Sequence, residues 1–579
     1  MQVVCKWGLQ AIKKIIPMKF FGKVTEGCAE GANLSGAERQ DRKTEGSLEN
    51  PVESGAEGAR LMPNLSGKRT ERYKLAISFS GASAFTEAFF IFILRRLIMQ
   101  AIQDFLLPIV VNINKYLSDY ILIILLVGTG LFFTIKTRFV QVRCFGEGMK
   151  RVFGNISLRG GKQKGGLSSF QALATAVAAQ VGTGNIVGAS GAILVGGPGA
   201  IFWMWIIAFL GMATIYAEAT LAQETKCVDE EGNVHGGPVY YIKKAFKGTF
   251  AKVLAIFFAI ATTLALGFMG TMVQSNSIAE NFESAFGIPT WIVGLVLAAI
   301  AAFIFIGGIN RLASVTEKLV PIMAVIFLLG GLVILGFRIQ FVPDAIGLIF
   351  KYAFAPQALV GGAFGAAIAQ AISQGAKRGL FSNEAGMGST PHAHATAKVD
   401  KPHDQGVVAM IGVFIDTFVV LTMTALVIIT CLYTGDGVLA GLSGDAYKVA
   451  TSGELALVSK STAMQLAASS IFGNFGNSFV AICLFFFAFS TIISWNFFGK
   501  LNVQYLFKNS KIATIVYSVV AVGFIFLGSL LSDDLVWELT DFFNYLMVIP
   551  NALALLALSG IVTKHARAKS TLSCELPKE

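Results

Sequence analysis

Two glycines and an asparagine interrupt a long apolar run at Gln180-Val181-Gly182-Thr183-Gly184-Asn185. The run extends from Phe170 to Val195, which is long enough to span a bilayer. Each glycine weakens a helix by about 1 kcal/mol relative to alanine, so we expect the backbone to unwind there. The freed carbonyl and amide groups need partners that lipid does not offer. Such a break can hold a solute or an ion at mid-membrane; the alternative is a glycine-rich helix packed against a neighbour.

Other polar side chains fall inside apolar runs, where they are costly and usually functional. Glu384 and Asp416 are the acidic candidates, whereas Glu218 lies nearer a span end and is expected to be structural. Ser490 and the Thr491/Trp495 pair lie on adjacent helical stripes, with Ser494 one turn beyond Ser490. Hydroxyls beside exposed carbonyls supply the hard oxygen ligands that a sodium ion needs. Alternatively, these hydroxyls bond the carbonyls of their own helix.

The composition excludes a soluble protein. Hydrophobic residues make up 54% of the 579-residue chain and charged residues only 14%, which is typical of an all-α polytopic membrane protein. The net charge of +11 comes without a nucleic-acid motif, so no nucleic-acid partner is expected. Eight basic residues between Lys136 and Lys164 against Glu147 predict a cytoplasmic loop. When the spans are counted from this loop, the basic residues of five later loops also fall on the cytoplasmic side.

Eleven apolar runs can be counted, and the ten after the first divide into two sets of five. Each set opens with a glycine-broken run, the second at Asn383-Glu384-Ala385-Gly386-Met387-Gly388. By the charge rule the two broken runs enter from opposite sides, which predicts an inverted repeat with a site at mid-membrane. The alternative is two unrelated glycine-rich spans. The expected spans are Ile121–Thr137, Phe170–Val195, Ala200–Gln223, Phe250–Val273, Trp291–Ile309, Leu319–Phe337, Gly362–Ser389, Val407–Leu432, Ser478–Phe498, Ile512–Leu531 and Val536–Val562.

The predicted organisation of the chain follows from these spans. Residues 1–98 are rich in Gly, Ser, Glu, Lys and Arg over much of their length and are expected to be a disordered extension. An extra span and a cytoplasmic loop then occupy residues 99–168. The two five-helix repeats cover residues 169–338 and 339–562, and a cytoplasmic tail covers residues 563–579.

Four other patterns give weak or no support for other chemistry. Gly182-x-Gly184-x-x-x-Gly188 departs from a dinucleotide fingerprint and follows no strand. His392, His394 and His403 could form a metal cluster but lie in a basic loop. The seven cysteines include no Cys-x-x-Cys pair, so neither a disulfide framework nor a zinc site is expected. No Ser/His/Asp set gathers at one predicted depth, and an enzyme is therefore not expected.

Long motifs carry a family resemblance. Val181 to Asn185, the run from Gly196 to Gly211 and the run from Lys377 to Gly386 resemble the alanine/glycine:cation symporter family. The resemblance covers residues 99–569. It implies a leucine-transporter-like 5+5 inverted repeat with one extra N-terminal span, located in the bacterial inner membrane. It also implies sodium-coupled uptake of small neutral amino acids, with no cofactor besides the co-transported sodium ion.

The resemblance also implies a set of site residues. The amides of Gly182, Thr183 and Gly184 would hold the substrate carboxylate, and Ala178 and Val181 would offer carbonyls to sodium. A proton-coupled transporter of the same fold is an alternative; a cation channel or a nutrient receptor is a more distant one. The remaining implied contacts are Gln180, Phe381, Thr491 and Trp495 with substrate, Ser490 and Thr491 with sodium, and Asn185 and Asp416 with a second ion or the substrate amine.

Overall fold

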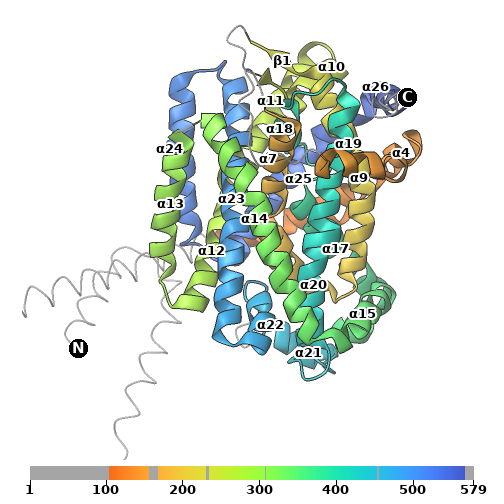
Figure 1. The fold of residues 1–579 in the computed structure, drawn as a ribbon, viewed down its shortest axis with the longest axis vertical. Coiled ribbons are helices and arrows are strands. Elements are labelled where there is room, and N and C mark those ends of the chain that lie inside the picture. Colours follow the sequence, from red (N-terminus) through yellow and green to blue (C-terminus); the bar gives the residue numbers. More distant parts are fainter. Residues whose placement is uncertain (1–102, 155–166, 230–233, 307, 453–455, 568–579) are drawn as a thin grey trace, which may run out of the picture. The chain divides into compact units, whose positions relative to one another are not determined.

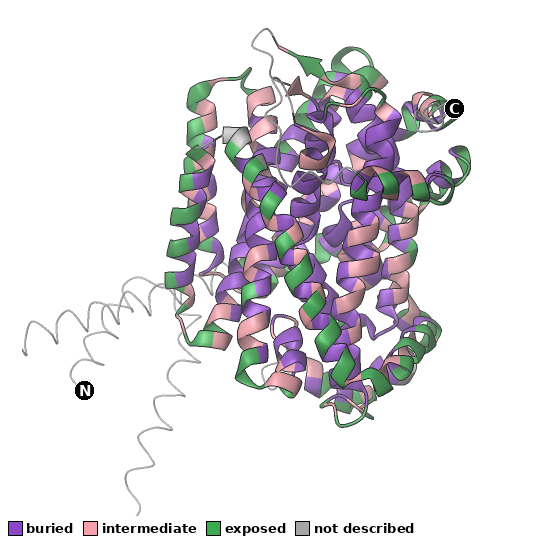
Figure 2. Cartoon of the chain, in the orientation of Figure 1, coloured by how far each residue is buried: buried purple, intermediate pink, exposed green. Residues whose placement is uncertain are grey.

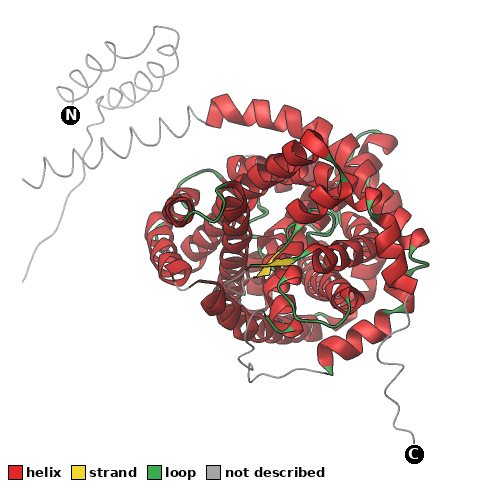
Figure 3. Ribbon diagram, turned by 90° about the horizontal axis from the view of Figure 1, so that it is seen from above, coloured by secondary structure: helices red, strands yellow, loops and turns green. Residues whose placement is uncertain are grey.

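The computed structural model describes residues 103–154, 167–229, 234–306, 308–452 and 456–567, and within these ranges the fold is helical (Figure 1). The predicted all-α fold is therefore confirmed. The exception is a hairpin of two short antiparallel strands, β1 (Cys227–Val228) and β2 (Val234–His235). The hairpin lies at the top of the bundle and near its middle when viewed from above (Figures 1 and 3). The predicted extension, residues 1–98, lies outside the described residues.

The first half of the bundle begins with a helical segment, Gln103–Lys136, that starts well before the predicted Ile121. It contains a π-helical turn, η2, before α4, and short helices follow it. The first broken helix comes next. The elements are η2 (Leu117–Leu122), α4 (Ile123–Lys136), α5 (Val140–Arg143), α6 (Phe145–Phe153), α7 (Ser169–Gln180), η3 (Gly184–Gly188), α8 (Ala189–Gly196), α9 (Ala200–Thr225), α10 (Pro238–Ala245), α11 (Gly248–Thr262), η4 (Thr263–Gly270), α12 (Thr271–Phe286), α13 (Thr290–Ile306) and α14 (Gly308–Phe337).

The second half repeats the order of a broken helix followed by long helices. Its broken helix is α17 with α18, and short helices lie between the longer ones. The elements are η5 (Ile339–Phe341), α15 (Val342–Phe354), α16 (Gln357–Val360), α17 (Phe364–Asn383), α18 (Pro391–Ala395), α19 (Pro402–Val413), η6 (Phe414–Leu421), α20 (Thr422–Ile428), η7 (Ile429–Tyr433), α21 (Gly444–Thr451), α22 (Ala463–Phe472), α23 (Asn474–Leu506), α24 (Lys511–Gly528), α25 (Asp533–Ala557) and α26 (Ser559–Arg567).

The described part of the chain contains eight helices long and apolar enough to cross a membrane, or nine if the bent pair Ser169–Gln180 and Gly184–Gly196 counts as one span. Two further predicted spans correspond to α13, which is apolar but has 17 residues, and to the discontinuous α17–α18. The count of eleven spans and the repeat boundaries therefore stay predictions. A multi-pass membrane protein is what the structure shows.

Burial separates central helices from peripheral ones (Figure 2). In the most apolar stretch of α23, 72% of the residues are buried, against 22% in α24 and 28% in the α14 span. The exposed side chains of α24 include Ile515 and Val519, which are apolar. An apolar outer face is what lipid contact requires. The hydroxyl-bearing α23 therefore lies in the interior, where polar side chains can meet partners.

Local chemistry fixes how the first broken helix starts. The side chain of Ser168 accepts a hydrogen bond from the amide of Gln171, whose own side chain accepts one from the amide of Ser168, each at 3.1 Å. This reciprocal cap begins α7. Leu167 pairs with the end of the second broken helix, donating from its amide to the Thr396 carbonyl at 3.0 Å. The start of one broken helix thus lies beside the end of the other.

Candidate functional site

The first break interrupts the backbone where the glycines predict it. Helix α7 ends at Gln180, Val181 is extended, and the segment from Gly184 to Gly196 is bent by 46° from α7. Side-chain amides cap the freed backbone. The Gly182 amide donates to the Asn185 side-chain oxygen at 2.9 Å, and the Thr183 amide donates to the Gln274 side-chain oxygen at 3.1 Å. The acceptors for the backbone amides of the first break are therefore neutral side-chain oxygens, which a ligand can replace.

The predicted sodium-binding residues lie together. The Ser490 hydroxyl reaches the Ala178 carbonyl at 3.3 Å. The Thr491 hydroxyl reaches the carbonyls of Ala178 at 2.9 Å and Val181 at 3.4 Å. Both hydroxyls also bond the Phe487 carbonyl of their own helix, at 2.8 and 3.1 Å, as the alternative interpretation of the sequence expected, while sodium binding stays a prediction. Two carbonyls and two hydroxyls converge, a set of hard oxygen atoms suited to an alkali cation.

Asp416 lies in the π-helical segment η6 and is fully buried. Its carboxylate accepts hydrogen bonds from the Asn185 amide at 2.6 Å, the Ser382 hydroxyl at 2.9 Å and the Thr417 hydroxyl at 2.8 Å. These donors are neutral, whereas the sequence led us to expect a cationic partner. Because Asn185 and Ser382 belong to the two broken helices, Asp416 links both breaks to a third span.

Trp495 and Phe381 form an aromatic wall beside the first break. The indole N–H of Trp495 donates to the Glu384 carboxylate, and its ring meets Phe381 edge-on with centroids 5.6 Å apart. A Cβ at Gly270 would clash with the indole ring. Glycine is therefore required there for the indole to occupy this position. The carboxylate of Glu384 also accepts a hydrogen bond from the Ser389 hydroxyl.

Several buried polar atoms around the first break have no hydrogen-bond partner among the described residues. Gln180 donates to the Asn383 carbonyl at 2.8 Å, but its side-chain oxygen has no partner there. Buried polar groups are normally satisfied, so such atoms mark a place where polar groups of a ligand can bind. The other three are the Thr183 hydroxyl, the Gln274 side-chain nitrogen and the Ser494 hydroxyl.

The second break has a different support. Glu384, Gly386 and Gly388 all adopt positive φ angles, of 58°, 94° and 82°. The fully buried carboxylate of Glu218 accepts hydrogen bonds from the Gly386 amide at 3.2 Å and the Gly388 amide at 3.0 Å. The Asn551 side chain donates to the same carboxylate at 2.6 Å. Glu218 thus holds the backbone of the second break in place.

The two breaks touch. A Cβ at Gly184 would lie 3.0 Å from both the Phe381 ring and the Ser382 backbone, and one at Gly182 would clash with the Thr491 hydroxyl. Every residue predicted for the site therefore lies in one buried region between α7, η3, η6, α17 and α23. Of these elements, α7, α17 and α23 are labelled within the bundle in Figure 1.

Sequence reasoning missed Gln274 and Ser382. Gln274 follows the predicted span Phe250–Val273 directly, in the polar run Thr271 to Ser277, so the helix was expected to end just before it. Helix α12 instead continues to Phe286 with Gln274 fully buried. The polar run Thr271 to Ser277 therefore marks a buried face of α12 and not the end of a span. Ser382 lies one residue after Phe381. The sequence places the pocket near Phe381 to Gly388 but does not single out residues within that stretch.

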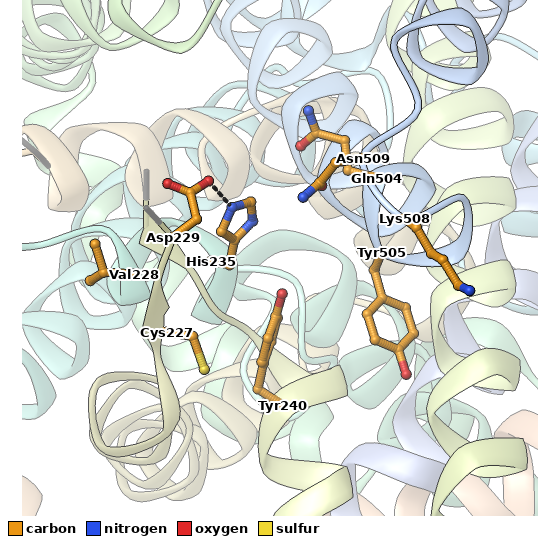
Figure 4. Close-up of a pocket in the computed structure, with 9 residues that line it drawn as sticks. All are labelled: Cys227, Val228, Asp229, His235, Tyr240, Gln504, Tyr505, Lys508 and Asn509. Carbon is orange, nitrogen blue, oxygen red and sulfur yellow. Dashed lines mark hydrogen bonds and ion pairs between the residues drawn. The ribbon is translucent and has the colours of Figure 1, made fainter. Parts of the chain in front are cut away.

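A separate cavity of about 240 Å³ lies away from the breaks, between the β hairpin and the end of α23 (Figure 4). His235 and Asp229 form an ion pair of 2.8 Å on its wall. Tyr240 and Tyr505 flank it. None of the residues predicted for the site lines this cavity.

Paired broken helices that meet inside a multi-pass helical bundle define a membrane transporter. Comparison with known families agrees: the model of the sodium:alanine symporter family matches residues 103–571, and the chain belongs to this family. It is 40% identical to the sodium/alanine symporter AgcS of Methanococcus maripaludis, over 80% of this chain and 97% of that protein. It is 39% identical to the amino-acid carrier protein AlsT of Bacillus subtilis, over 77% and 89%.

Among solved structures, the chain is similar to MhsT in complex with L-phenylalanine. The TM-score is 0.47 with 16% sequence identity, and the match covers 70% of this chain and 98% of that one.

Proposed function

We propose that the protein is a secondary active symporter of the cell's inner (plasma) membrane that imports small neutral amino acids, chiefly alanine and glycine, together with sodium. One observation carries the proposal: the hydroxyls of Ser490 and Thr491 converge on the carbonyls freed at the first break. An intact helix would offer no free carbonyls at mid-membrane. Oxygen atoms so arranged form a cation site when the hydroxyls turn their lone pairs inward.

The unpartnered polar atoms suit an amino-acid zwitterion. The Thr183 hydroxyl and the Gln274 side-chain nitrogen are donors for the carboxylate, and the Gln180 oxygen is an acceptor for the ammonium group. The Thr183 amide, now bonded to Gln274, joins the carboxylate site when that side chain turns. Trp495 and Phe381, whose rings meet edge-on, would bound the space for the substrate side chain and keep it small.

Coupling follows from the shared site. Sodium and substrate bind at the same break, so each raises the affinity of the other by the same factor. Asp416 with Asn185 supplies a second place for an ion or for the substrate ammonium group. The two broken helices then move with their neighbours to expose the site to either side in turn. Import follows from the inward sodium gradient.

The test is uptake of labelled alanine into proteoliposomes of the purified protein, with and without an inward sodium gradient. Uptake should require sodium. Ser490→Ala removes one oxygen ligand and should raise the sodium concentration for half-maximal uptake by about tenfold, corresponding to about 1.4 kcal/mol. Ser478→Ala is the control, because that hydroxyl bonds the Asn474 carbonyl of the same helix, far along α23. Sodium-independent uptake would refute the coupling.

Proton coupling is the second candidate, favoured by three fully buried carboxylates, Glu218, Glu384 and Asp416. Buried carboxylates can carry a proton across a membrane. Uptake measured with an inward proton gradient and without sodium distinguishes proton coupling from sodium coupling. Uptake driven by that gradient alone would replace sodium with a proton as the coupling ion.

A further inference from the structure

Three side chains that can bind a metal meet at the end of the bundle predicted to be cytoplasmic. Cys144, Glu147 and His403 each bring one ligand atom, and the three atoms lie within 4.8 Å of one another. The His403 Nε2 and Glu147 Oε2 atoms are 3.5 Å apart. In a tetrahedral zinc site with bonds of 2.0–2.3 Å, neighbouring ligand atoms are about 3.4–3.8 Å apart. Small side-chain movements would therefore bring the three to ligating distance.

Secondary structure holds these residues in place. Cys144 precedes the first turn of α6 and Glu147 lies within it, while His403 lies in the first turn of α19. Helix α6 packs against α19. The exposed fractions are 6% for Cys144 and 3% for His403, and the Glu147 side chain is 12% exposed. The cluster is thus nearly enclosed, with Glu147 on the side nearest solvent.

The second nitrogen of His403 already has a partner. Its Nδ1 atom lies 2.7 Å from the Tyr216 hydroxyl of α9. When Nδ1 carries the proton and donates to that hydroxyl, the Nε2 lone pair points at Cys144 and Glu147. Metal-ligating histidines are almost always oriented by such a second hydrogen bond.

The local charges also suit a dication. Arg151 pairs with the other Glu147 oxygen at 3.0 Å and with Asp404 at 2.8 Å. The carboxylates of Glu147 and Asp404 and a Cys144 thiolate would supply negative charge for a cation, beside the guanidinium groups of Arg151 and Arg143. Oε2 of Glu147 can bind it while Oε1 keeps its ion pair with Arg151.

We propose that Cys144, Glu147 and His403 form a binding site for a divalent transition metal of the zinc type, distinct from the transport site. One thiolate, one imidazole and one carboxylate are the ligands that zinc accepts, with water in the fourth position. The bound ion joins α6 to the start of α19, whose continuation η6 carries Asp416.

The grouping of His392 and His394 with His403, which had weak support in the sequence, is not found among the described residues. The His392 Nε2 atom bonds the Asn502 side chain at 2.9 Å, and the His394 Nδ1 atom bonds the Gln405 side chain at 2.9 Å. Neither belongs to the cluster around His403. The ligand set joins residues far apart in the sequence, and no short motif could have shown it.

The proposal is tested with Co²⁺, whose thiolate complexes absorb in the near ultraviolet. The purified full-length protein, stripped with a chelator, should bind one Co²⁺ per chain with a thiolate charge-transfer band, and Zn²⁺ should abolish the band by displacement. Cys144→Ser should remove the band. Cys227→Ser is the matched control, because that cysteine is exposed and lies on the β hairpin. Tyr216→Phe should weaken Co²⁺ binding by about tenfold or more.

Melting of the unmodified protein gives a measurement that needs no variant. A ligand that binds the folded state raises the melting temperature, so Zn²⁺ should raise it and Mg²⁺ at the same concentration should not. A wild-type protein with neither a thiolate band nor a Zn²⁺-dependent shift overturns the proposal. So does a band that persists in Cys144→Ser or disappears in Cys227→Ser.

Discussion

The two helix breaks solve the same problem with different chemistry. At the first, side-chain amides of Asn185 and Gln274 cap the freed backbone N–H groups. At the second, the buried carboxylate of Glu218 accepts from two backbone amides at once. One carboxylate therefore joins two backbone amides at the second break, whereas each amide at the first break has its own separate cap. We expect the second break to be the more rigid of the two.

This difference indicates a division of labour. Neutral caps at the first break can be exchanged for a substrate carboxylate at little cost. The Glu218 carboxylate already occupies the amides of Gly386 and Gly388, so an anion would have to displace it to use them. We expect the first break to contact the substrate and the second to act as its fixed support. The following changes test that contrast.

The largest effect is expected from Glu218→Ala. It leaves the amides of Gly386 and Gly388 and the Asn551 side chain without their acceptor in a dry interior. Unsatisfied buried donors cost about 1–3 kcal/mol each, so we expect a loss of about 3–5 kcal/mol in stability. The measurement is thermal melting in detergent. Glu218→Gln, which keeps an acceptor oxygen, should melt between the two; equal melting of Glu218→Ala and wild type would contradict the supporting role.

Gly182→Ala should damage binding and spare the fold. The added Cβ would clash with the Thr491 hydroxyl and lie 3.1 Å from the Gln274 side-chain oxygen. Displacing both groups should weaken alanine binding by about tenfold or more, which is about 1.4 kcal/mol. Gly188→Ala is the control, because its nearest neighbour would be 3.6 Å away. Equal alanine affinity in the two variants would remove Gly182 from the site.

Asp416→Asn tests the link between the breaks. An amide nitrogen would face the donors of Asn185, Ser382 or Thr417, and one hydrogen bond would be lost at a cost of about 1–3 kcal/mol. We expect weaker sodium dependence and a several-fold loss of alanine uptake. Asp436→Asn serves as the comparison, because the Asp436 side chain is 84% exposed. Full uptake with an unchanged ion dependence would show that the charge is not needed.

The smallest effect on alanine binding is expected from Trp495→Ala. The variant loses an aromatic contact, which should weaken alanine binding only about twofold to threefold, or about 0.5 kcal/mol, and it opens space beside Phe381. Leucine should then compete with labelled alanine. Trp291→Ala is the matched control, since that side chain is 48% exposed on α13. A variant that binds alanine as before and still rejects leucine would show that Trp495 does not line the pocket.

The sequence predicts the breaks because two closely spaced glycines weaken a helix in the middle of an apolar run. It predicts the polar stripe of α23 as well, because Ser490 and Thr491 lie in an otherwise apolar helix. Their convergence on Ala178 and Val181 came from family resemblance, and the structure has the same contacts. The membrane class and the all-α fold follow from composition alone.

The remaining contacts depend on tertiary structure. Glu218 lies far from Gly386 in the sequence, and neither residue reveals the other. The sequence did not identify Gln274 as a site residue, because a buried polar face and the end of a span have the same composition. The neutral donors to Asp416 were not predicted, because a lone carboxylate in a span suggests a cation whereas three neutral donors also bind it. The second ion or substrate amine expected at Asp416 stays a prediction.

The bond between Trp495 and Glu384 has an evolutionary consequence. The indole is both a wall of the proposed substrate pocket and a donor to a carboxylate at the second break. A lineage that replaced Trp495 to accept a larger substrate would leave that carboxylate short of a donor. Adaptation to new nutrients should therefore proceed by paired substitutions, with positions 384 and 495 covarying among relatives.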